Sequence, residues 1–376
     1  MEDDNELVTL TVNGQDFAGW KSVEIGAGVE RQARDFSLGV TWRWPGSESF
    51  DTKIKQGDRC EVRIGNDLVL TGWVFATPIR HDRKQIELKI SGRSLTADLV
   101  DACPADKPGQ WRNQTIEKVL RSLIAPYPNV LVVNEGRDST VVKDHTVKPG
   151  ETVFESIDRL LTISRLFSTD DGQGRLVMAR PGSAGRAHDA LEIGERGNIL
   201  SCDAPLDFSK VFSEYVCKGQ HAADDDDEAD ASGAEVVASN VDDRIGRYRR
   251  LVINESGQVT KDLAQWRADW EREHRISKAL ELTYKVQGWR QSNGALWVPN
   301  QTVRVRDPLV GLDRDMLIAE LTYQEDRSSG RICTMKVAPP DGFEPEPNDK
   351  RKRMKLKKSK SKDGFEYLLP SDWEKN

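Results

Sequence analysis

The stretch that decides the fold is GDRCEVRIGNDLVLTGWVFATPIRHDRKQIELKISG, residues 57–92. Apolar and polar residues alternate in three short runs, Cys60–Ile64, Leu68–Phe75 and Ile86–Ile90, which polar turns separate. Alternation with a period of two is typical of antiparallel strands that bury one face. We therefore predict a three-stranded β meander in this segment.

A similar pattern recurs about 245 residues later in NQTVRVRDPLVGLDRDMLIAELTYQEDRSSGRICTMKVAPP, residues 300–340. Its strand-like runs are Thr302–Val305, Met316–Tyr323 and Ile332–Val337, in the same order and with a charged last turn. Two interpretations stay open, because unrelated β meanders also share these features. If the pattern is an internal duplication, it suits a protein that builds a surface or a ring.

Composition places the chain among soluble proteins with several domains. It has 376 residues, of which 37% are hydrophobic and 31% are charged. No apolar run reaches the length of a membrane span, and the acidic start lacks the features of a secretory signal. We expect no stable membrane association. The five cysteines contain no CxxC pair, which favours neither a zinc site nor a disulfide framework and fits a reducing cytoplasm; they are Cys60, Cys103, Cys202, Cys217 and Cys333.

Charge is distributed unevenly along the chain. The net charge is −7, but residues 350–362 hold nine Lys or Arg and no acidic residue, so the remainder carries −16. An acidic body is unlike a duplex-DNA binder, which neutralises phosphates with clustered cations. The basic run is typical of a solvated terminus. Residues 224–233 are acidic and rich in small side chains, and we expect a loop there.

Two segments between the β modules predict amphipathic helices. Apolar residues at helical spacing run from Ile116 to Ile124, and Pro126 ends the pattern. In a second helix, Thr152 and Glu155 have the spacing of a capping box, and Phe154 opens an apolar stripe. A third helix is expected at 261–276, with its tryptophans on one side.

Motifs for catalysis or cofactor binding are absent. No GxxxxGK[ST] occurs, and Gly26-Ala27-Gly28 and Gly172-Gln173-Gly174 lack the third glycine of a dinucleotide fingerprint. The acidic run from Asp224 fails the calcium-loop spacing. The histidines stand far apart without HExxH or a nucleophile elbow, although a triad is recognised by geometry alone; they are His81, His145, His188, His221 and His274. We predict a protein that is not an enzyme, with no catalytic, cofactor-binding or metal-binding residues and no cofactor.

The ten tryptophans favour packing over ligand binding. Pairs on one strand or helix face can stack on sugars or bases, but cores and protein interfaces use such residues more often. The pairs are Trp42 with Trp44, Trp266 with Trp270, and Trp289 with Trp297.

Four features in this order resemble a known family. They are Ile90-Ser91-Gly92-Arg93-Ser94-Leu95-Thr96-Ala97-Asp98 after the first module, the Thr-Val-Lys-Pro-Gly-Glu-Thr helix start at 146–152, Val216-Cys217-Lys218-Gly219-Gln220, and Val337-Ala338-Pro339-Pro340-Asp341. The chain resembles the central baseplate hub proteins of contractile-tailed phages, the Mu-like members most of all. This family is related to the late control D proteins and to the base of type VI secretion spikes.

The resemblance implies a β-rich α+β fold with two similar small antiparallel β-barrel tube domains, an α+β domain and a tail. The implied limits are 1–97 for the first barrel, 98–194 for the α+β domain with a possible extension at 222–278, 195–221 with 279–340 for the second barrel, and 341–376 for a C-terminal extension.

The resemblance also implies a structural role needed for tail assembly. Three chains would form a homotrimer, a pseudo-sixfold ring that joins the tail tube protein to the central spike protein and contacts other baseplate proteins. DNA would pass through the channel without specific binding. From the charge we add the hypothesis that the acidic surplus lines that channel, since bound phosphates would stall the passage of DNA. The protein would be part of the virion tail baseplate, assembled in the host cytoplasm.

One motif supports an alternative. His145-Thr146-Val147-Lys148-Pro149-Gly150-Glu151-Thr152 before a helix also resembles the start of a LysM module, which binds peptidoglycan. A LysM continues to a second helix and a closing strand, whereas a Gly-rich hairpin is expected here. A peptidoglycan-binding tail protein is therefore the alternative function.

Overall fold

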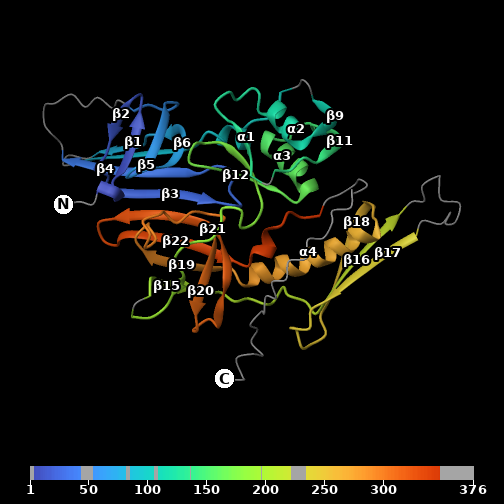
Figure 1. Cartoon of the computed structure of the whole chain (residues 1–376). Helices are drawn as coiled ribbons and strands as arrows, with labels where there is room; N and C mark the ends of the chain where they lie inside the picture. The colour runs from blue at the N-terminus through green and yellow to red at the C-terminus, as the bar shows by residue number, and fades with distance from the viewer. Residues whose placement is uncertain are drawn as a thin grey trace.

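A computed structural model describes residues 4–43, 54–81, 85–105, 109–135, 137–195, 197–221 and 234–347. The fold is β-rich α+β, as predicted (Figure 1). Fourteen of the described strands form one sheet, and three smaller sheets hold the others. The acidic run 224–233 and the basic run 350–362, for which the sequence predicts a loop and a solvated terminus, lie outside the described residues.

The first β module is built from strands of the N-terminal quarter of the chain, with a short 3-10 helix, η1 (Asp4–Glu6), before it. Its main strands are β1 (Val8–Val12), β3 (Ser22–Gly28), β4 (Asp35–Arg43), β5 (Arg59–Ile64), β6 (Asp67–Ala76) and β8 (Gln85–Ser94). Two short strands extend it, β2 (Gln15–Phe17) beside β1 and β7 (Ile79–His81) beside β8. The pairing order is β3-β4-β8-β6-β5-β1.

The second β module repeats this order with six other strands. They are β14 (Leu191–Glu192), β15 (Ile199–Asp203), β19 (Leu282–Gln287), β20 (Thr302–Asp307), β21 (Leu312–Asp326) and β22 (Gly330–Ala338). Their pairing order is β15-β19-β22-β21-β20-β14, the same as in the first module when both are numbered along the chain. One pair differs in direction, since β14 is parallel to β20 whereas β1 is antiparallel to β5. The matching order favours duplication over a chance likeness.

The two modules share one sheet and one hydrophobic core. Strand β3 of the first module pairs with β21 of the second, and the buried cluster continues across this joint. Figure 1 shows β3 lying next to β21. Within the described residues the pairing closes neither module into a barrel, because β2 and β15 are the two ends of one path. The expected pair of similar antiparallel β domains is present as two modules that are joined edge to edge in one continuous sheet.

The helical part of the chain packs beside the first module around a core of its own. Its helices are α1 (Ala97–Asp101), α2 (Ile116–Leu123), α3 (Val153–Leu161) and the 3-10 helix η2 (Thr162–Ser164). Its strands are β9 (Gln110–Thr115), β10 (Val132–Asn134), β11 (Val141–Thr146), β12 (Phe167–Asp170) and β13 (Leu176–Ala179). The predicted helices at 116–124 and after Thr152 are both present.

A third layer lies beyond the second module. Strands β16 (Glu214–His221), β17 (Ala234–Val241) and β18 (Arg250–Gln258) form a sheet, on which helix α4 (Lys261–Ala279) packs through Ala264 and Ala268. The 3-10 helix η3 (Pro340–Phe343) contacts α4. Residues 195–221 are therefore divided, because β15 joins the second module and β16 does not. We therefore propose that the limit of the second domain lies between β15 and β16, and that β16 belongs with the α4 layer.

Local signals account for several element boundaries. Asn13 and Gly14 both have positive φ, 52° and 75°, as a tight hairpin turn between β1 and β2 requires. Thr152 accepts from the Glu155 amide while the Glu155 carboxylate accepts from the Thr152 amide, which completes the predicted capping box. Short-range chemistry thus starts and ends these elements without help from the rest of the fold.

Candidate functional site: the joint between the modules and the polar groove

The joint between β3 and β21 is the main connection between the two modules. Its antiparallel register runs from Ser22 opposite Asp326 to Gly28 opposite Glu320. At its centre Ile25 faces Tyr323, and both side chains are buried. The Tyr323 hydroxyl donates to the Trp297 carbonyl oxygen, and burial raises the pKa of that phenol. Tyr323 therefore stays neutral and ties the joint to the core of the second module.

Ion pairs flank the same joint on its solvent side. The Arg31 guanidinium contacts Asp35 at 2.8 Å and Glu320 at 3.2 Å, which links β4 to β21. Burial raises the pKa of Asp35, and Arg31 beside it opposes that change. The Lys278 ammonium of α4 lies 3.2 Å from Glu30. These exposed contacts add geometric definition more than stability.

A second joint attaches the helical part to the first module. Thr71 of β6 donates to the Gly172 carbonyl oxygen at 3.0 Å, which holds the turn between β12 and β13 against the sheet. A Cβ at Gly172 would lie 2.2 Å from the Leu68 carbonyl oxygen, so only glycine fits this approach. Gly172-Gln173-Gly174 thus belongs to a packed turn, and Gly26 and Gly28 lie within the first joint. Neither segment forms a phosphate-binding loop.

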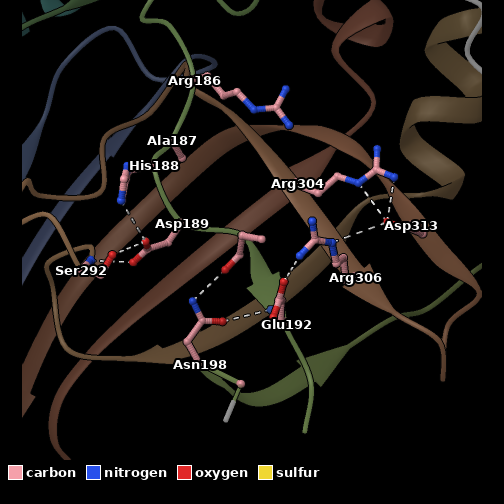
Figure 2. A pocket seen from close by; sticks show the side chains of 12 residues that line it. Arg186, Ala187, His188, Asp189, Glu192, Asn198, Ser292, Arg304, Arg306 and Asp313 are labelled. Carbon is pink, nitrogen blue, oxygen red and sulfur yellow. Dashed lines mark hydrogen bonds and ion pairs between the residues drawn. The ribbon is translucent and has the colours of Figure 1, made fainter.

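A polar groove opens beside β14 and β20 of the second module (Figure 2). Three arginines in it each face a carboxylate. Arg306 pairs with Glu192, Arg304 with Asp313 at 2.8 Å, and Arg186 with Asp315 through two hydrogen bonds of 2.7 Å. With its guanidinium groups paired in this way, the groove is not organised to hold an anionic ligand.

His188, Asp189 and Ser292, the three residue types of a nucleophilic triad, meet at the edge of this groove. Asp189 accepts from the Ser292 amide at 2.6 Å, and its carboxylate is 4.0 Å from His188 Nε2. Figure 2 shows Asp189 between the other two residues. A nucleophilic triad instead requires the imidazole between the hydroxyl and the carboxylate. The contact between Asp189 and Ser292 instead holds the segment before β14 against the turn that contains Ser292.

The other described histidines lie in separate elements. His145 of β11 is buried and its Nε2 is 2.9 Å from Ser156 Oγ. His274 of α4 stacks on Trp270 with 4.6 Å between ring centroids, and His81 ends β7. Within the part of the chain that the structure describes, no group of three or more His, Cys, Asp or Glu side chains is arranged to hold a metal ion.

Tryptophans serve packing where their side chains are described. Trp289 and Trp297 are buried in the second module. Trp266 lies under the Arg165 guanidinium at 4.5 Å, and the Trp270 indole donates to the Glu344 carbonyl oxygen at 2.6 Å. Neither pair forms an open stacking platform. The pair formed by Trp42 and Trp44 falls outside the described side chains.

The LysM alternative fails on topology. After α3 and the short η2, the chain enters β12 and then β13, which form an antiparallel hairpin. A second helix does not follow, so residues 145–180 lack the order that a LysM requires. The Thr152 capping box accounts for the motif's appearance, because it starts the helix in any fold.

Three segments match family models of phage baseplate proteins. Residues 7–94 match the N-terminal domain of the Mu phage GpP-like baseplate assembly protein, 96–180 the second domain of gp44-like baseplate hub proteins, and 260–346 the fourth domain of Mu phage GpP. The chain is also 30% identical over 346 residues to baseplate hub protein gp44 of Escherichia phage Mu, covering 90% of this chain and 89% of the relative. The chain belongs to the Mu baseplate hub family.

Solved structures agree with this family. The 43 kDa tail protein of prophage MuSo2 from Shewanella oneidensis has a TM-score of 0.79 to this hub protein, with 30% identity over 90% of this chain and 99% of that chain. A tail protein from Neisseria meningitidis MC58 has a TM-score of 0.75 at 21% identity, covering 91% and 98% of the two chains. The c3393 protein of E. coli, a type VI secretion component, shares the fold at 10% identity, with a TM-score of 0.52 and coverage of 92% and 80%.

The structure adds one residue group that the sequence did not single out. The joint residues Ile25 and Tyr323 come from ordinary alternating strands, and only the duplication hinted at a relationship between the modules. The candidate functional features of this hub protein are therefore the joints between its parts.

No helix among the described residues has the length and apolar character needed to cross a membrane.

Proposed function

We propose that this hub protein forms a homotrimeric, pseudo-sixfold ring in the tail baseplate, joining the tail tube protein to the central spike protein around the DNA channel. The observation that carries the proposal is the repeated pairing order of the two β modules. Three chains with two equivalent modules each supply six similar units, which match a hexameric tube in number. A closed ring of this kind also covers sheet edges that a single chain leaves open.

The proposed role is structural and does not involve catalysis. The groove beside β20 holds paired charges, and its His188, Asp189 and Ser292 cluster lacks the order of a triad. In the proposed assembly, ring residues provide shape and contacts while the helical part faces neighbouring baseplate proteins. The ring would assemble in the host cytoplasm and would be needed for tail assembly.

DNA passage gives the acidic charge a role. Outside residues 350–362 the chain carries −16, which would repel phosphates from the bore and prevent DNA from binding there. A ring map with a neutral or basic bore would remove this part of the proposal without affecting the trimer.

The test is the solution mass of the full chain by light scattering after size-exclusion chromatography. We expect about 127 kDa, three times the 42.3 kDa chain, and ring-shaped particles by electron microscopy. A monomer over a wide concentration range, both alone and with the spike protein added, would overturn the ring.

A further inference from the structure

We infer that β15 of one chain pairs with β7 of a second copy in the register that β3 adopts with β21 inside one chain. This rests on the proposed ring, because it specifies the edges through which the copies meet. The partner is thus another copy of this chain, and the contact is a head-to-tail continuation of the sheet. Such a heterologous contact produces a ring when its rotation closes.

Matching bulges align the central strands of the two modules. The register between β6 and β8 shifts between Val74 and Ala76, and the register between β21 and β22 shifts between Ile318 and Glu320. Ala76 is therefore equivalent to Glu320. Counting onward along both ladders makes Ile79 of β7 equivalent to Tyr323 of β21. Strand β7 thus continues β6 as the second half of β21 continues its first half.

The outer strands align in the same way. Leu38 of β4 and Tyr284 of β19 occupy equivalent positions beside β8 and β22. Val23 pairs with Leu38, and Cys202 pairs with Tyr284, so Val23 and Cys202 are equivalent. Ile25 and Ala204 follow two residues later. Burial agrees, because Val23 and Ile25 are buried and Cys202 and Ala204 pack partly against the same core.

The equivalent edges differ in whether they are covered. Tyr323 is 3% exposed because β3 is paired beside it in the sheet, whereas Ile79 is 50% exposed. Among the described residues, β7 pairs only with β8, and β15 pairs only with β19. Leu200 on β15 is 52% exposed. Apolar side chains on open strand edges favour association with another strand, and the internal joint shows which strand fits.

Transfer of the internal register gives three cross-chain pairs. The pair of Ile25 with Tyr323 becomes Ala204 with Ile79 of the second copy. Asp203 takes the place of Glu24, and Arg80 of the second copy takes that of Gln324, which brings opposite charges together. Cys202 takes the place of Val23, and His81 of the second copy takes that of Glu325. The first and third pairs lie on the core face of the sheet, and the charged pair lies on the other face. The two edges are thus complementary in both apolar character and charge.

The decisive experiment is disulfide cross-linking of the full chain. A His81→Cys substitution places a thiol opposite native Cys202 of the neighbour, at a separation that cross-strand cysteines bridge. Exposed Cys103 is first changed to Ser to remove an unrelated thiol. After mild oxidation we expect covalent trimers on a non-reducing gel, and a Cys202→Ser change should abolish them. Arg80→Cys, one residue away and on the opposite face, is the matched control and should remain uncross-linked.

A second pair of variants measures the apolar contact. Ile79→Asp should reduce the mass from three chains to one while the circular dichroism spectrum stays that of the folded chain, because Ile79 is half-exposed in the single chain. Val141→Asp, at a residue 53% exposed on β11, should remain trimeric. A trimeric wild type that neither cross-links through His81→Cys nor dissociates with Ile79→Asp would overturn this pairing and leave the ring standing. A wild type that stays monomeric, both alone and with the spike protein added, would instead overturn the ring itself.

Discussion

Arg34 and Asp170 form a buried ion pair that joins the first β module to the helical part of the chain. The Arg34 amide and Nε donate to the Asp170 carboxylate at 3.0 and 3.2 Å. Arg34 also donates to the Val69 carbonyl oxygen at 3.1 Å, and the Ser94 hydroxyl donates to Asp170. Burial raises the pKa of Asp170, and the adjacent Arg34 opposes that change. One side-chain pair thus connects β6, β8 and β12.

Asp170→Asn should destabilise the protein strongly. It leaves the Arg34 guanidinium, 14% exposed, without its counter-charge, and removal of one partner of a buried pair costs about 3–5 kcal/mol. Urea unfolding followed by circular dichroism measures the loss. Asp101→Asn is the matched control, because its pair with Arg93 is exposed and should contribute at most about 1 kcal/mol. Equal effects of the two substitutions would contradict this role of Asp170.

Gly172→Ala should weaken the attachment of the β12–β13 turn to β6. The added methyl would approach the Leu68 carbonyl oxygen, so the turn must shift, at a cost of about 1–3 kcal/mol in unfolding free energy. Gly246→Ala serves as control, since open space surrounds that position. Unchanged stability of Gly172→Ala, measured by the same urea titration, would show that the turn adapts freely.

Thr152→Ala should lower the unfolding free energy by about 1 kcal/mol, because α3 loses the side-chain acceptor for the Glu155 amide. Thr152→Ser keeps a hydroxyl at the cap and should restore most of that loss. Thermal unfolding of the three proteins side by side measures the difference. If Ala and Ser variants melt together below the wild type, the methyl group rather than the cap is responsible.

Thiol reactivity should separate Cys103 from the other cysteines. Burial raises the pKa of Cys60 to about 12 and that of Cys217 to about 11, so little reactive thiolate exists at pH 8. Cys103 is exposed and should react rapidly with an aromatic disulfide reagent, while Cys60 and Cys217 react only after unfolding. Stopped-flow absorbance with and without urea checks this, and Cys103→Ser should remove the fast phase.

Insoluble peptidoglycan should not retain the protein. The segment 145–180 starts like a LysM but continues into the β12–β13 hairpin. Sedimentation with purified sacculi should therefore leave the chain in the supernatant, as for an unrelated acidic protein of similar size. Specific co-sedimentation would bring the cell-wall-binding alternative back.

Much of the fold was predictable because its signals are local. Period-two alternation located β5, β6 and β8 and their counterparts β20, β21 and β22, and Thr152 with Glu155 located the start of α3. Residues 214–221 also alternate, yet β16 pairs with β17 and β18 and not with a strand of the second module. Alternation shows that a segment is a strand but not which strand it joins, because backbone hydrogen bonds are the same for every partner.

The sequence by itself determined many of the strands and helices, the likeness of the two β patterns and the resemblance to the hub family, since periodicity, caps and turns act over a few residues. The strand pairing order then favoured duplication. Only the tertiary structure decided that Ile25 meets Tyr323, that Arg34 meets Asp170, and that Ile79 stays uncovered. Such contacts join residues far apart in the chain, and the burial that makes them matter exists only once the sheet has formed. The physical reason is that local conformation is set by neighbours in sequence, while pairing and burial are set by neighbours in space.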